Sequence, residues 1–94
     1  MARVVVTLRI MPKDTDVDFS GLIKNATARI QTFTKNPAVE TKHELKPVAF
    51  GLQALELKFV MDESQGSTEE LEKTIATIPG IMSVEAIDVR RAVG

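Results

Sequence analysis

The sequence has no cysteine, no tryptophan and no tyrosine, and it has a single histidine in 94 residues. Without cysteine the chain can form no disulfide, no thiolate nucleophile and no sulfur-ligated metal site. His43 alone cannot make a multi-histidine metal site, and a Ser–His–Asp triad would depend on it entirely. Because His43 lies in a charged segment, we expect its side chain to be exposed and without a catalytic role.

Positive charge is not in excess, since 12 basic and 13 acidic side chains leave a net charge of −1. Proteins that bind nucleic acid usually have a basic excess and aromatic side chains on which bases stack. The aromatic residues of this chain are 4 phenylalanines. We therefore expect no direct nucleic-acid binding.

No apolar run approaches the roughly 20 residues that a membrane-spanning helix needs. The apolar segment near the N-terminus is too short and too alternating for a signal peptide. A hydrophobic fraction of 44% and a charged fraction of 27% are ordinary for a globular domain. We expect one cytoplasmic domain that covers residues 1–94.

Alternating hydrophobicity predicts four strands, at residues 3–11, about 39–46, 52–61 and 81–91. The second segment carries regularly spaced charges, which is typical of an edge strand that must not pair with other chains. In the last segment the alternation fails around Ala86 and Ile87, and a β-bulge would explain the failure.

Apolar residues at helical spacing predict two helices. One runs from about residue 18 to residue 33. The other begins at residues 67–70, a capping-box sequence in which Ser67 serves the third helical amide and Glu70 reaches back. Pro79-Gly80 ends this second helix.

The predicted order of elements is strand, helix, strand, strand, helix, strand, which is the split βαβ pattern. Right-handed crossovers then place both helices on one face of a four-stranded antiparallel sheet. The predicted fold class is α+β, a ferredoxin-like βαββαβ sandwich. Because proteins of this fold have many different functions, the function has to be inferred from the residues of a site.

Three features are unusual for an ordinary small domain, and one of them is the short tail Ala92-Val93-Gly94, which we expect to belong to a surface. The other two are a phenylalanine and a pair of arginines. Phe50 lies at the tip of the predicted hairpin, where it either folds back over the core or stands exposed as an anchor for a partner. Arg90 and Arg91 end the last strand, where they are either solvated or meet acidic or phosphate groups of a partner. The strand order puts the hairpin and the arginines at opposite ends of the sheet, roughly 30 Å apart.

Three stretches of the sequence resemble the elongation factor 1-beta family in its archaeal form. They are residues 4–12 (VVVTLRIMP), 47–55 (PVAFGLQAL) and 83–94 (SVEAIDVRRAVG). Asp16-Val17-Asp18, before the first helix, agrees as well. The resemblance spans the whole chain in the same order, and its hairpin and ending are its most specific parts.

The resemblance implies an exchange factor that binds elongation factor 1-alpha, GDP-bound or nucleotide-free, and weakens its nucleotide and magnesium site. No cofactor, metal or bond-making chemistry of its own is implied. The family's hairpin phenylalanine contacts the GTPase, which points to Phe50, with Gly51 shaping the turn. Eukaryotic relatives place a C-terminal lysine near the magnesium ion, whereas this chain ends in Ala92-Val93-Gly94. Arg90 or Arg91 is the candidate replacement, and the charged edge strand favours a free monomer.

Other functions of this fold each require something that the sequence lacks. An amino-acid-binding regulatory module needs a glycine-containing loop after the first strand, and an acylphosphatase-like enzyme needs an arginine there. Residues 12–15 (PKDT) provide neither. A metal carrier needs paired cysteines, and an RNA-recognition domain needs aromatic residues on its central strands, where only Phe59 is present.

Overall fold

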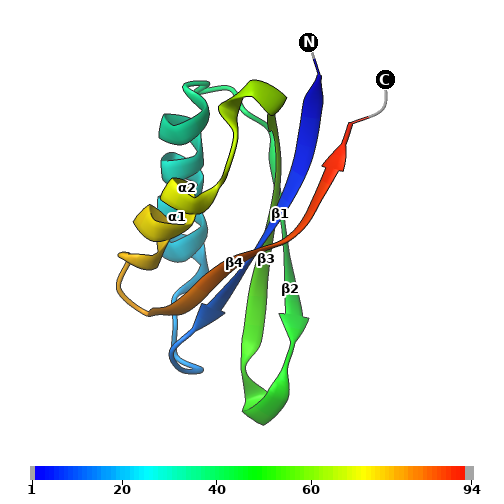
Figure 1. Cartoon of the computed structure of the whole chain (residues 1–94). Coiled ribbons are helices and arrows are strands. Elements are labelled where there is room, and N and C mark those ends of the chain that lie inside the picture. Colours follow the sequence, from blue (N-terminus) through cyan, green and yellow to red (C-terminus); the bar gives the residue numbers. More distant parts are fainter. Residues whose placement is uncertain (1, 93–94) are drawn as a thin grey trace.

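The computed structural model describes residues 2–92 and contains one antiparallel sheet with both helices on the same face (Figure 1). The elements are β1 (Arg3–Pro12), α1 (Phe19–Thr34), β2 (Thr41–Pro47), β3 (Gln53–Asp62), α2 (Glu69–Ala76) and β4 (Ile81–Arg91). Two short turns, η1 (Ala49–Gly51) and η2 (Glu63–Gln65), flank β3. The predicted α+β ferredoxin-like fold is confirmed.

The strand order β2-β3-β1-β4 places β1 and β3 in the middle of the sheet. Val6 of β1 lies opposite Phe59 of β3 on one side and opposite Val89 of β4 on the other. β2 is an edge strand, as its charges predicted, and its residues from 42 to 47 are all exposed. Within residues 2–92 no helix is long and apolar enough to cross a membrane.

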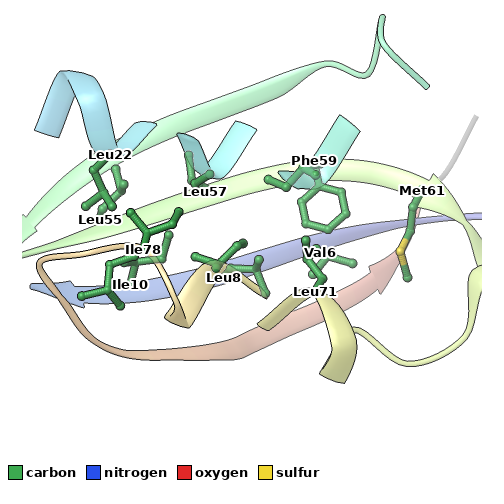
Figure 2. Packing of buried hydrophobic residues seen from close by; sticks show 14 of the residues in the cluster. Val6, Leu8, Ile10, Leu22, Leu55, Leu57, Phe59, Met61, Leu71 and Ile78 are labelled. Atoms are coloured by element: carbon green, nitrogen blue, oxygen red, sulfur yellow. The ribbon is translucent and has the colours of Figure 1, made fainter. Parts of the chain in front are cut away.

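The core lies between the sheet and the two helices, and Figure 2 shows the interlocking side chains. Alternation at period 2 along the strands and near 3.6 along the helices brings apolar residues to this one layer. Burial of each large apolar side chain contributes roughly 1.5–3 kcal/mol. The main residues of the core are Val4, Val6, Leu8, Ile10, Leu55, Leu57, Phe59 and Met61 from the strands and Leu22, Ala26, Ile30, Leu71 and Ile75 from the helices.

The predicted capping box at the start of α2 is wrong in its detail. The N-cap residue is Thr68, and Ser67 Oγ accepts the first helical N–H rather than the third. Thr68 is 8% exposed, and its hydroxyl donates to Glu72 Oε2 at 2.8 Å. This buried contact moves the start of the helix one residue along the chain. Glu70 pairs instead with Lys73 along the helix, at 3.7 Å.

The bulge expected in β4 is present. Along β1 the partner residue in β4 moves directly from Asp88 to Ala86, so Ile87 is the extra residue. The Ala86 N–H donates to Glu72 Oε1 of α2 at 3.3 Å, which ties the bulged strand to the helix. A second shift, nearer the start of β4, leaves out Met82.

Phe59→Ala should lower the free energy of unfolding by about 3–5 kcal/mol, because Phe59 is 1% exposed and its truncation leaves a cavity. Urea unfolding followed by circular dichroism measures the change. The control is Val89→Thr in the same row of the sheet, where the side chain is 56% exposed and we expect a change within about 0.5 kcal/mol. Equal losses for the two variants would contradict the described core.

Candidate functional site

The tip of the β2–β3 hairpin is a two-residue turn made by Phe50 and Gly51. Phe50 has φ 61° and ψ 31°, and Gly51 has φ 76°. The Leu52 N–H donates to the Ala49 carbonyl at 3.2 Å, and the Val48 N–H donates to the Leu52 carbonyl at 2.9 Å. Positive φ at both central residues and the Ala49–Leu52 hydrogen bond are features of a type I′ turn, which lies at the tip of the connection formed by residues 48–52.

Phe50 is an unusual residue for such a turn. A type I′ turn needs positive φ at both central positions, which Asn and Gly adopt readily and bulky side chains do not. The left-handed conformation costs an ordinary L-residue about 1–2 kcal/mol. The hairpin keeps an aromatic side chain here at the expense of local stability, which indicates a use for the ring.

The Phe50 side chain projects into solvent. It is 96% exposed, so it does not fold back over the edge of the core, and its role as an anchor stays a prediction. Gly51 has open space around its missing side chain, so its role in the turn is its positive φ rather than a close approach. Sequence reasoning had placed a turn here between Pro47 and Gly51, but it missed the type I′ geometry that Phe50-Gly51 adopts.

Three strands are joined by charges at the base of this hairpin. Arg9 of β1 lies 3.1 Å from Glu56 of β3, and Lys46 of β2 lies 3.7 Å from Glu56 and 3.2 Å from Glu44. Glu56 is only 5% exposed. The hydrogen bond to Glu44 and the charge of Glu56 raise the pKa of Lys46. These contacts tie the edge strand to the middle of the sheet and so fix the direction in which the turn points.

Arg90 and Arg91 lie at the other end of the sheet and on opposite faces of it. Arg91 lies opposite Val4, whose side chain faces the helices, and its guanidinium is 3.3 Å from Glu63 Oε1. Arg90 lies on the uncovered face, with its Nε 2.9 Å from Asp88 Oδ2. Sequence reasoning treated the two as a pair, although the period of 2 along a strand was the signal that separates them.

The predicted separation of the two regions holds. Figure 1 shows the β2–β3 turn at one end of the sheet and the end of β4 at the other. The pairing of the C-terminal end with β1 continues to Ala92, whose N–H donates to the Arg3 carbonyl at 2.9 Å. Val93 and Gly94, the last two residues of the tail for which a role was expected, lie outside the described residues.

Groups that could perform chemistry are spread out in the part of the chain that the structure describes. His43 is exposed on β2, and residues 2–92 contain no group of three or more His, Asp or Glu side chains that could hold a metal ion. What the geometry does offer is an exposed aromatic ring at one end of a stiff sheet and two cationic side chains at the other.

Comparison with known proteins identifies the family of this chain. Residues 5–92 match the model of the EF-1 guanine nucleotide exchange domain. The chain belongs to this family. Elongation factor 1-beta of Methanobrevibacter smithii is 42% identical to it, over 97% of this chain and 98% of the relative. The protein of the same name from Methanocella arvoryzae is 38% identical, over 98% and 99% of the two chains.

The family resemblance drawn from the three sequence stretches is thus confirmed. Membership in the family supports a role in nucleotide exchange during translation elongation and, with it, an interaction with elongation factor 1-alpha. Among solved structures, a de novo designed protein, Foldit4, superposes with a TM-score of 0.60 at 20% identity, over 98% of each chain. At that identity the likeness shows the fold alone.

Phe50→Asn should raise the free energy of unfolding by about 0.5–1 kcal/mol, because Asn adopts the left-handed conformation readily. Phe50→Ala is the control, since it removes the ring but keeps an ordinary residue at positive φ, and we expect no comparable gain. Thermal or urea unfolding of the three proteins measures the difference. A Phe50→Asn variant no more stable than Phe50→Ala would show that the turn is not strained.

Proposed function

We propose that this chain promotes the exchange of GDP for GTP on elongation factor 1-alpha by binding the GTPase and weakening its nucleotide and magnesium site. The observation that carries the proposal is Phe50, 96% exposed in a strained turn, in a chain of the EF-1 exchange family. Exposed aromatic side chains are frequent anchors of protein interfaces. A turn whose backbone is held by hydrogen bonds also lowers the backbone ordering cost of presenting its anchor.

Exchange of this kind requires no bond-making chemistry from the factor. A factor that binds the nucleotide-free GTPase more tightly than the GDP-bound one must weaken GDP binding by the same ratio. Its means are therefore shape, an apolar anchor and placed charge. In this proposal the chain needs no cofactor, acts in the cytoplasm and is a monomer when free.

We assign the two ends of the sheet different tasks. Phe50 and Gly51 grip the GTPase, whereas Arg90 and Arg91 act nearer to the nucleotide. The ion pairs of the arginines support this assignment, because exposed pairs such as Arg90–Asp88 and Arg91–Glu63 hold their partners only weakly. Both guanidinium groups can therefore exchange a carboxylate of this chain for an anionic group of the GTPase.

Phe50→Asn should weaken binding to elongation factor 1-alpha at least about 30-fold, as expected for the loss of an aromatic anchor worth about 2 kcal/mol. The dissociation constant is measured by titration, and the rate of GDP release is measured separately with a fluorescent GDP. Because the same variant should fold at least as stably as the wild type, a loss of binding cannot be ascribed to unfolding. Unchanged affinity would remove Phe50 as the anchor.

Arg90→Gln and Arg91→Gln together should lower the maximal rate of GDP release at saturating factor more than they lower affinity. The reason is that groups near the nucleotide act on the rate of GDP release, whereas the distant hairpin supplies most of the binding free energy. Titrating the release rate against factor concentration separates the two quantities. Lys73→Gln, which also removes an exposed positive charge but on α2, is the control. An effect on affinity alone would contradict the proposed division of tasks.

A further inference from the structure

The face of the sheet away from the helices has a charge pattern that the proposed function does not use. Residues directly opposite each other in an antiparallel pair share a face, so the register of β2 with β3 sets the neighbours on this surface. Lys42 lies opposite Lys58, and Glu44 lies opposite Glu56. Both are pairs of like charge, which are unfavourable at directly opposed positions.

The two like-charged pairs differ in how they are balanced. The acidic pair is neutralised within the sheet by Arg9 and Lys46, at 3.1–3.7 Å from carboxylate oxygens. Lys42 and Lys58 are exposed, and within residues 2–92 neither has an ion pair. The fold therefore joins its acidic pair to cations, whereas the two lysines form no ion pair within the described residues.

A hollow of about 440 Å³ adjoins the basic pair at the end of the sheet that carries the arginines. Its wall includes Lys58, Arg90 and a single carboxylate, Asp88, which Arg90 already binds. Arg91 also lines the hollow, but its guanidinium lies beside Glu63 and adds no free charge to this face. Lys42 lies across from Lys58 at the adjoining edge. The hollow and the basic pair together form one surface of net positive charge, on a chain whose overall charge is −1.

We infer that this surface, formed by Lys42 and Lys58 on the uncovered face of the sheet beside Arg90, binds carboxylate side chains on an acidic patch of the GTPase. The inference rests on the proposed function and adds a third contact region to the two ends of the sheet. Charge complementarity identifies the occupant, because carboxylates of a partner would form the ion pairs that the two lysines do not form within the described residues. An acidic protein surface fits better than a nucleic acid, because none of the aromatic residues in the described range lies on this face for bases to stack on.

The test is charge reversal with a matched control. Lys58→Glu should raise the dissociation constant for elongation factor 1-alpha about tenfold or more and flatten its dependence on salt, and adding Lys42→Glu should raise it further. Lys73→Glu on α2 makes the same change in net charge at an exposed position on the opposite side of the molecule. We expect that control to change the dissociation constant less than twofold. Circular dichroism verifies that all variants are folded.

Each outcome distinguishes the inference from the proposed function. If the wild-type chain does not accelerate release of fluorescent GDP, the proposed function fails and the inference fails with it. If the wild type accelerates release but Lys58→Glu binds no worse than Lys73→Glu, the inference alone is overturned. The third measurement is the binding of a short single-stranded RNA to the wild type and to Lys58→Glu. RNA binding by the wild type that Lys58→Glu abolishes, with GTPase affinity unchanged, would also overturn it.

Discussion

The register of β1 between its two neighbours is the constraint on which the candidate contact regions depend. The pairing of Val6 with Phe59 on one side and Val89 on the other fixes which residues face the helices. A slip of one residue would send every side chain of a strand to the other face. A slip in β4 would exchange the faces on which Arg90 and Arg91 lie. A slip in β3 would turn Glu56 toward the apolar layer. Burial of the core therefore fixes the positions of charges that contribute little to it.

Most of the fold could be predicted because it follows from periodicity. Alternation along residues 3–11 and 52–61 predicted the two central strands and their buried faces, and the charges of residues 39–46 predicted an edge. The bulge at Ile87 was visible as a break in the same pattern. The start of α2 was misplaced, since Ser67 and Glu70 form a plausible capping box locally. The burial of Thr68 against Glu72, a tertiary contact, decided the outcome.

The candidate site was less predictable, because its properties arise between segments. Sequence reasoning could single out Phe50 at a hairpin tip, but it could not decide whether the ring was buried. That depends on a turn in which Phe50 and Gly51 both have positive φ. The opposed pair Lys42 and Lys58 was invisible for the same reason. The two residues are distant in sequence, and their charges become neighbours only when the register of β2 with β3 is known.

Both unfavourable features, the strained turn and the opposed lysines, lie on the β2–β3 hairpin and away from the helices. Local strain and exposed like charges are tolerated there because the apolar layer on the other face supplies the stability. A protein that acts by binding needs such sites, since groups already satisfied within the fold gain little from a partner. The turn and the two lysines lie at different points along a molecule 42 Å long, so a partner that uses both must contact several sites at once. A GTPase whose parts shift on losing its nucleotide would match that spacing in one state better than in the other, and such a difference in affinity is what exchange requires.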